Sequence, residues 1–472
     1  MKGSRKKLFI ENFLVYGIGG GLNKLIPFIM LPILTRIYPT TEYVGVNEMF
    51  TVGLTFVSCV TGLGLYDAMF RFFFDNEKND NRIEICSSCL KFEIMVDCFA
   101  LLIIILFRQF ISIFLFEKEE LSGLVLILGF SVFFTNMNSI LSAPVRMLNK
   151  RKTYLTINIL SAMITYGVTL IAVLNGYYYI AQPIGTVVSL IIASVIYFFI
   201  CREWFCLKKY NVETIKKLLL FSIPLVPNII LFWIFNSADR LMIKSIIDVE
   251  TVGIYSIGGK IGHISNLIYT AFAGGWQYFV FSTMKDGDQK DLTRRILEYV
   301  SSVAYVSTMM ITCISIPMFR LLFTEEYWVA AYIVPYLFLA PLMLMQYQVI
   351  TDQFLVLKKT TYSLIVSLVG VLLNVWLNWM GIILFGFEAA AVSTLVSYFI
   401  MVILSGVLLR KYGYAVLTKR YLLLSIMIII FIALWRVVLS KYVIVTVGVT
   451  LLLSILVVFL FRDDLRCLFK RS

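Results

Sequence analysis

The stretch GIYSIGGKIGHI, residues 253–264, places a lysine and the only histidine of the chain inside a long apolar segment. Lys260 falls near the middle of that segment, so its side chain could reach an aqueous interface only with difficulty. On a helical wheel, Ser256 and His263 fall on the same side as Lys260, and the opposite side is Ile and Tyr. This pattern predicts a cation that faces a cavity and attracts an anion.

Lys24 raises the same question near the start of the chain, in the segment YGIGGGLNKLIPFIMLP, residues 16–32. Glycines stack beneath this lysine on one helical face, and the first of two prolines follows it and would kink a helix. The glycine stripe predicts either close helix packing or a bendable helix that lines a cavity. The candidate hinge residues are Gly17, Gly20, Gly21 and Pro27.

Two interpretations of the lysines stay open at this point. Each could form a structural ion pair with an acidic residue of a neighbouring helix, and Asp97 and Glu48 are available for that. Alternatively, both lysines could line one cavity, where two compact point charges suit a diphosphate group. Asp97 is also the candidate site for a coupling proton or ion. The further candidate cavity or coupling residues are His263, Ser256 and Glu48.

Apolar residues dominate the whole chain of 472 residues, of which 60% are hydrophobic, with a mean hydropathy of +0.89. Apolar runs of about 20 residues recur, and each is long enough to cross roughly 30 Å of hydrocarbon as a helix. Backbone polar groups in lipid must be satisfied within the protein. The sequence therefore predicts an all-α polytopic membrane protein with about fourteen transmembrane helices.

The basic residues predict an orientation in the membrane. Most of the 41 Lys and Arg residues fall in the two terminal tails and in alternate loops, which the positive-inside rule assigns to the cytoplasm. Both termini are therefore expected to be cytoplasmic. Topology and anionic lipid account for the net charge of +13, so nucleic acid is not an expected partner. Eight cysteines and one histidine provide no metal-ligand set, and no metal site is expected.

Three pairs of segments match at one shared shift of 208 residues along the chain. The pairs are 42–46 (EYVGV) with 250–254 (ETVGI), 150–157 with 358–365, and 181–189 with 389–397. The shared shift predicts two parallel six-helix lobes related by a pseudo-two-fold axis along the membrane normal. Such lobes can rock about a central site and give alternating access. The expected parts are an N-terminal lobe over 1–200, a cytoplasmic interfacial linker over 201–217, a C-terminal lobe over 218–408, and two further helices with a basic tail over 409–472.

Four segments of the chain resemble the Wzx-type polysaccharide-repeat flippases, whose superfamily also contains the lipid II flippases and the multidrug and toxin extruders. The segments are LPILTRIYPTTEYVGVNEMFT (31–51), ADRLMIKSIIDVETVGIYSIGGKIGHI (238–264), GGWQYFVFS (274–282) and LNVWLNWMGIILFGFEAAAVSTLVSY (373–398). The resemblance implies a V-shaped, two-lobe bundle of helices in a bacterial cytoplasmic (inner) membrane.

The cargo implied by this resemblance is an oligosaccharide repeat on undecaprenyl diphosphate, for O-antigen or another glycan, moved from the cytoplasmic to the outer leaflet. The resemblance also implies cations on the first and eighth helices, and Lys24 and Lys260 stand where those would fall. Arginine is common there in the lipid II branch, so lysine keeps the charge attraction without bidentate phosphate binding. A polysaccharide polymerase and its chain-length machinery are candidate partners, besides membrane lipid.

The main alternative is a drug or cation exporter of the same fold, which should favour acidic rather than basic residues in its cavity. A polymerase or ligase would need a larger exterior loop, so no catalytic residues are expected. A passive assembly scaffold would have no reason to place two lysines at mid-membrane depth. No cofactor is expected beyond coupling to a proton or sodium gradient.

Overall fold

The computed structural model describes residues 25–76, 78–284, 287–462 and 464. These residues form α-helices, short 3₁₀ helices and turns, with no strand among them. The predicted fold class, an all-α polytopic membrane protein, is confirmed. The described residues divide into two compact units, the first ending at Ser256 and the second beginning at Ile257. The predicted lobe boundaries stay predictions.

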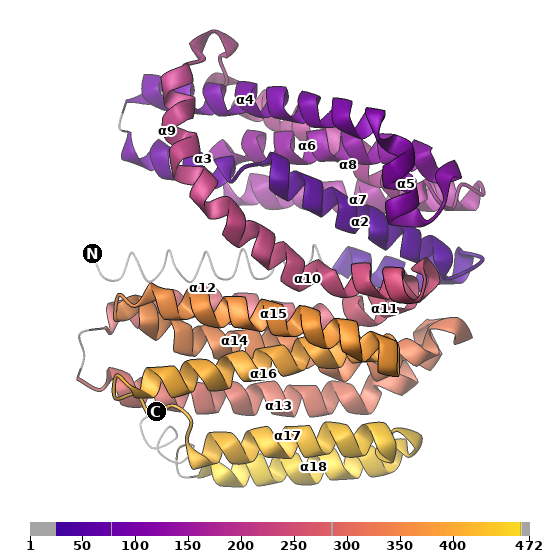
Figure 1. The fold of residues 1–472 in the computed structure, drawn as a ribbon, viewed down its shortest axis with the longest axis vertical. Coiled ribbons are helices and arrows are strands. Elements are labelled where there is room, and N and C mark those ends of the chain that lie inside the picture. The colour runs from indigo at the N-terminus through magenta and orange to yellow at the C-terminus, as the bar shows by residue number, and fades with distance from the viewer. Residues whose placement is uncertain (1–24, 77, 285–286, 463, 465–472) are drawn as a thin grey trace. The chain divides into compact units, whose positions relative to one another are not determined.

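The first unit begins with the helix Leu25–Ile37 and continues through ten helices that Figure 1 labels. They are α2 (Glu42–Thr61), α3 (Leu65–Asp75), α4 (Asn79–Leu106), α5 (Arg108–Phe116), α6 (Ser122–Met147), α7 (Arg151–Leu174), α8 (Ala181–Cys201), α9 (Val212–Ser222), α10 (Val226–Ile246) and the start of α11 (Val249–Gly262). The 3₁₀ helices are η1 (Glu119–Leu121), η2 (Arg202–Trp204), η3 (Leu207–Lys209) and η4 (Ile223–Leu225). Apolar side chains of α3, α4, α6, α8 and α9 form its core.

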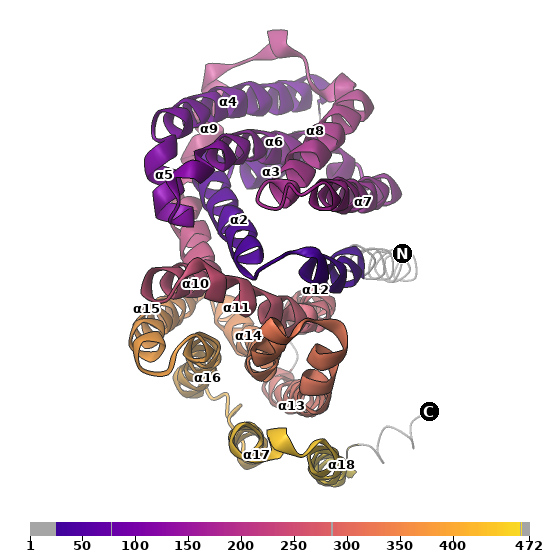
Figure 2. The ribbon, with the colours of Figure 1, turned by 90° about the vertical axis from the view of Figure 1, so that its right-hand side faces the viewer.

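The second unit takes up the end of α11 and the remaining elements. They are η5 (His263–Ser265), α12 (Asn266–Ser282), α13 (Gln289–Leu322), η6 (Glu325–Tyr332), α14 (Val334–Val356), α15 (Thr360–Phe385), α16 (Glu388–Arg410), α17 (Lys419–Val437), η7 (Leu439–Lys441) and α18 (Val443–Leu460). Among its long apolar helices, α14 is the most buried, with 89% of its most apolar 18-residue stretch buried. Helices α17 and α18 lie side by side, joined through η7 (Figure 2).

Within the described residues, 11 helices are long and apolar enough to cross a membrane, or up to 12 if the bent pair α4–α5 forms one span. The expected count of fourteen is not confirmed. The first expected span, over about residues 11–34, lies largely outside the described residues. The eighth, expected over residues 250–272, is divided, because η5 separates α11, of 14 residues, from α12, of 17 residues.

The segment 201–217, expected to be an interfacial linker, consists of η2, η3 and the first half of α9. Its aromatic residues do not lie on a surface helix. Trp204 is buried with its ring centroid 5.3 Å from that of Phe73, and Phe205 is buried beside it in the core of the first unit. The segment is therefore held to the first unit by apolar packing.

The helix boundaries follow the shift of 208 residues. The shift moves Arg151, where α7 begins, to Lys359, next to the start of α15, and it moves Ala181, where α8 begins, to Ala389 near the start of α16. The packing pattern repeats as well. In the first unit α4 packs on α6, α6 on α8 and α7 on α8, and in the second α13 packs on α14, α14 on α16 and α15 on α16.

Two glycines related by the same shift meet near the starts of α2 and α11. A Cβ on Gly45 would collide with the backbone carbonyl of Val249, and a Cβ on Gly253 would collide with the carbonyl of Thr41. Val249 and Thr41 are also 208 residues apart, so the contact has local two-fold symmetry, in which each partner presents the same surface. Only glycine allows the two backbones to approach this closely.

We predict that Gly45→Ala destabilises the protein by about 1–3 kcal/mol, because the added methyl meets a backbone atom that cannot move aside. Thermal unfolding of the full chain in detergent measures the change. The matched control is Gly167→Ala on α7, where a Cβ meets nothing within 4 Å. That control should be neutral or slightly stabilising, and equal destabilisation by both substitutions would contradict the proposed close contact.

Candidate functional site

Lys260 lies in the last turn of α11 with an exposed side chain. Its helix neighbours Tyr255, Ile257 and Ile261 are all buried, with at most 1% of each side chain exposed. The charge therefore emerges from a buried stretch of α11, residues 255–262. His263 begins η5 and is half-buried, and its Nδ1 lies 4.0 Å from the position of a Cβ on Gly259.

The polar face drawn on a single helical wheel does not persist through the structure. Ser256 is buried, and its hydroxyl has no hydrogen-bond partner among the described residues, whereas Lys260 one turn later is exposed. The α-helix ends at Gly262, and the residues beyond η5 belong to α12. The prediction treated residues 250–272 as one regular helix, and the 3₁₀ break ends that periodicity.

The second predicted cation and three of the candidate hinge residues lie outside the described residues. These are Lys24, Gly17, Gly20 and Gly21. Pro27, the fourth hinge candidate, lies in the helix Leu25–Ile37 and is half-buried. A joint cavity of the two lysines therefore stays a prediction.

Glu48 on α2 is buried and belongs to an ionic cluster with α10 and α11. Arg240 Nε lies 2.8 Å from its carboxylate, and Arg240 Nη1 lies 3.4 Å from the carboxylate of Asp239. The hydroxyl of Tyr255 donates to the other oxygen of Asp239 at 2.7 Å. Arg240 thus compensates this buried carboxylate. The cluster links three helices through charges that lipid cannot solvate.

Asp97 belongs to a different polar cluster, between α2, α4 and α6. The amide of Asn136 on α6 donates to Asp97 at 2.8 Å and to the hydroxyl of Thr61 at 2.7 Å. Glu93 lies one turn before Asp97 on α4 and is equally buried. Both oxygens of the Glu93 carboxyl have no hydrogen-bond partner among the described residues. The structure therefore places a second acidic group beside the predicted one.

Sequence reasoning gave Glu93, Asn136, Asp239 and Arg240 no role at a site. The spacing of Glu93 and Asp97, four residues apart, puts two acids on one helix face and was the signal available for that pair. No sequence signal identifies Arg240 as the partner of Glu48, because the two residues lie on helices far apart in the chain.

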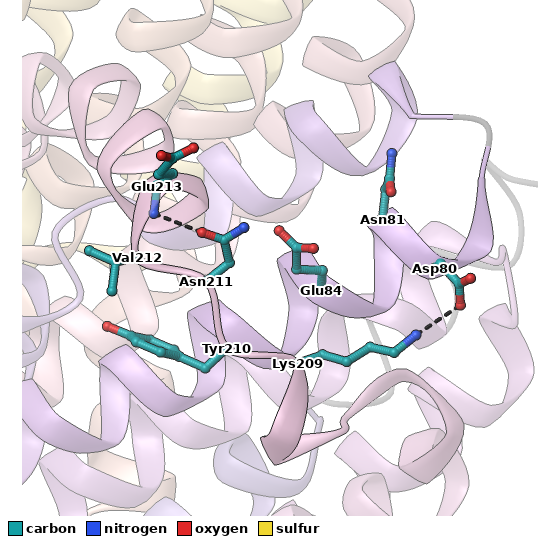
Figure 3. A pocket seen from close by; sticks show the side chains of 8 residues that line it. All are labelled: Asp80, Asn81, Glu84, Lys209, Tyr210, Asn211, Val212 and Glu213. Atoms are coloured by element: carbon teal, nitrogen blue, oxygen red, sulfur yellow. Dashed lines mark hydrogen bonds and ion pairs between the residues drawn. The ribbon is translucent and has the colours of Figure 1, made fainter.

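A pocket of about 700 Å³ opens at the polar start of α4, beside η3 and α9 (Figure 3). The polar side chains at this pocket mostly form hydrogen bonds or ion pairs with neighbouring groups. Lys209 Nζ lies 2.8 Å from Asp80, the backbone N–H of Glu213 donates to the side chain of Asn211 at 2.9 Å, and Thr214 donates to Glu84 at 2.6 Å. These contacts between side chains therefore hold η3 and α9 against α4.

The Asp80–Lys209 contact lies outside the apolar part of α4 and responds to pH. The hydrogen bond from Lys209, and then its charge, hold the pKa of Asp80 below its ordinary value. A carboxyl with a lowered pKa contributes stability at pH values above its ordinary range. That contribution is lost as the pH falls through the lowered pKa.

The helix arrangement is that of a known class of membrane transporters. The chain superposes on the lipid II flippase MurJ in its inward closed conformation with a TM-score of 0.73, at 16% identity over 96% of this chain and 100% of that one. It also matches a multidrug resistance MATE family transporter of the MOP superfamily, with a TM-score of 0.65 at 12% identity, covering 85% and 95% of the two chains. A Vibrio cholerae MATE transporter gives 0.59 at 13% identity, covering 89% and 100%. The protein is a multi-pass membrane protein with this transporter fold.

The sequence model of the family described as "Polysaccharide biosynthesis protein" matches residues 33–332, and the chain belongs to that family. A search of curated protein sequences gave no match. The structural and family matches are to flippases and transporters, not to enzymes. The predicted polysaccharide branch of the superfamily is therefore confirmed, while the cargo is a separate question.

We predict that Arg240→Met costs about 3–5 kcal/mol of stability, because it leaves the buried carboxylates of Glu48 and Asp239 without their cation. Arg71→Met is the control, since the Arg71–Asp75 pair on α3 is exposed and should contribute about 0–1 kcal/mol. Unfolding of both variants in detergent is compared with the unsubstituted chain. If the two variants lost the same stability, the ionic cluster would not hold α10 against α2.

Proposed function

We propose that the protein is a flippase for undecaprenyl-diphosphate-linked oligosaccharides in a bacterial inner membrane, with both termini in the cytoplasm. Membership of the polysaccharide biosynthesis family and the fold shared with a lipid II flippase support a lipid-linked cargo. Alternating access would move the sugar head group to the outer leaflet while the lipid tail stays in the bilayer.

The observation that carries the proposal is the exposed Lys260 within a buried stretch of α11, between residues 255–259 and 261–262. A lysine at this depth in a membrane protein costs about 2.5–3.5 kcal/mol on insertion scales, so it is retained for a reason other than packing. Its ammonium group can neutralise phosphate as a point charge, and Lys24 is the proposed second cation. A diphosphate needs such charges during transfer and must also be released afterwards.

Lys260→Ala should reduce delivery of lipid-linked oligosaccharide to the outer leaflet by about tenfold or more, which corresponds to ~1.4 kcal/mol of lost interaction. Lys260→Arg should retain part of the activity, since it keeps the charge. The measurement uses a strain that lacks this protein and asks which leaflet holds the undecaprenyl-linked oligosaccharide. Protein level is measured in parallel.

Lys441→Ala in η7 is the matched control, because it removes an exposed lysine of the second unit outside the proposed site. It should transport normally. Normal transport by Lys260→Ala at normal protein level would eliminate the cationic site. If no lipid-linked oligosaccharide accumulated without the protein, the cargo itself would be wrong.

A drug or cation exporter of the same fold is the second candidate, favoured by the structural matches to MATE transporters. The buried acids Glu93 and Asp97 are the groups that such an exporter would use for a cationic substrate. The two candidate functions differ in their cargo. An exporter confers resistance to a cationic drug, and that resistance should not depend on Lys260.

Transport is proposed to be coupled to a proton or sodium gradient through Asp97, which is buried and hydrogen-bonded to Asn136. We expect Asp97→Asn to remove the dependence of transport on that gradient while keeping the shape of the side chain. The comparison uses vesicles with and without an imposed gradient. A variant that responds to the gradient as fully as the unsubstituted chain would clear Asp97 of this role.

A further inference from the structure

Helix α4 carries two carboxyl groups on one face, inside the apolar part of the first unit. Glu93 and Asp97 are four residues apart, and each has only 2% of its side chain exposed. Side chains at this spacing are neighbours on a helix surface. Two ionised carboxylates so close together in a water-poor environment repel each other and lack hydration, so one of them is expected to be protonated.

The hydrogen bonds indicate which of the two carries the proton. Asp97 accepts a hydrogen bond from the amide of Asn136 at 2.8 Å, which stabilises its ionised form. Both oxygens of Glu93 lack a hydrogen-bond partner among the described residues. An ionised Glu93 would therefore be buried without compensation, whereas a neutral carboxylic acid is far less costly there. The proton accordingly belongs on Glu93.

Among the described residues, no lysine or arginine forms an ion pair or hydrogen bond with Glu93. Its titratable neighbours are Asp97 and Cys89 of α4 itself, while α2 presents Thr61 and α6 presents Asn136. Five basic residues on α4 and the elements packed against it contact other groups: Arg71 with Asp75, Arg82 with the Asn76 carbonyl, Lys91 over the Tyr210 ring, Arg146 over the Tyr66 ring, and Lys209 with Asp80. The others on these elements form no hydrogen bond or ion pair with Glu93; they are Arg108, Arg202, Lys208, Lys216 and Lys217. A proton is thus the positive charge that this site can take up.

The Glu93 carboxyl lies near the turn that separates α2 from α3. A Cβ on Gly62 would lie 3.9 Å from a carboxyl oxygen of Glu93 and 3.6 Å from the side-chain oxygen of Asn136. The next two residues, Leu63 and Gly64, have φ values of 46° and 66°. A leucine in this left-handed region is strained, and such strain persists only where the surroundings impose it. Glu93 therefore lies close to a strained turn.

The second unit provides an internal comparison. The shift of 208 residues moves Glu93 to Ser301 and Asp97 to Tyr305, on the corresponding helix α13. Both are neutral and satisfied: Ser301 donates to the Leu297 carbonyl at 2.6 Å, and the Tyr305 hydroxyl lies 3.0 Å from that of Ser425. The shared helix packing therefore does not require acids at these positions, and their presence in the first unit calls for another explanation.

We propose that Glu93 is a proton-binding site, which holds one exchangeable proton beside Asp97, Asn136 and Thr61 at the α2–α3 break. Binding converts the Glu93 carboxylate to the neutral acid, and release returns the proton to water and leaves two negative charges one turn apart. The use of this step in transport rests on the proposed flippase function, whereas the protonation itself is measured without cargo.

The test is infrared spectroscopy of the purified full-length protein in lipid vesicles at neutral pH. A protonated carboxyl group has a C=O stretch that an ionised carboxylate lacks. We expect this band in the unsubstituted chain and its loss in Glu93→Gln, which keeps the shape and neutrality of the protonated acid. Glu93→Gln should therefore unfold at the same temperature as the unsubstituted chain or higher. Asp97→Asn should keep the band.

Glu298→Gln is the matched control, because Glu298 is a buried acid of the second unit that is paired with Arg420 and Thr418. Its substitution should leave the band unchanged. Persistence of the band in Glu93→Gln, or its loss in Asp97→Asn alone, would overturn the assignment to Glu93. Loss of the band on addition of sodium chloride at constant pH would show a sodium site instead of a proton site. If the infrared band assigns the proton to Glu93 but a gradient has no effect on flipping, the proton-binding site is supported and only its role in transport is refuted.

Discussion

The structure depends on the scarcity of water in the bilayer interior, which obliges each polar group to find its partner within the protein. Helices satisfy the backbone, and side chains must then satisfy one another. In the second unit the buried amide of Gln346 accepts from Tyr305 at 3.3 Å and from Tyr421 at 3.2 Å. Arg436 makes two hydrogen bonds to Glu388 at 2.9 and 3.0 Å. These contacts attach α17 to α13, α14 and α16, so polar satisfaction also determines helix packing.

The two units use one helix plan but satisfy this requirement with different chemistry. The corresponding positions of α4 and α13 carry acids in the first unit and hydroxyl groups in the second. The first unit also contains the buried cluster of Glu48, Arg240 and Asp239. Neutral networks are insensitive to pH near neutrality, whereas an acid held in apolar surroundings can change its charge. At these corresponding positions, only the first unit therefore carries groups that can change their charge.

The fold by itself leaves the cargo open, because flippases and multidrug transporters share it. The distinction has to come from the charges that each chain places within the membrane. Lys260 suits an anionic head group, and the pair Glu93 and Asp97 suits a small cation.

The sequence by itself determined the class of protein and indicated most of its long helices and an internal repeat, because hydropathy and segment similarity are local properties of the chain. It also identified Asp97 as a buried acid and Lys260 as a cation on an apolar segment. Only the tertiary structure decided that Arg240 compensates Glu48, that Glu93 is buried beside Asp97, and that η5 ends the helix after Lys260. The partner of a buried charge depends on which helices pack together, and a helix breaks where that packing outweighs local propensity. Neither is a property of one segment alone.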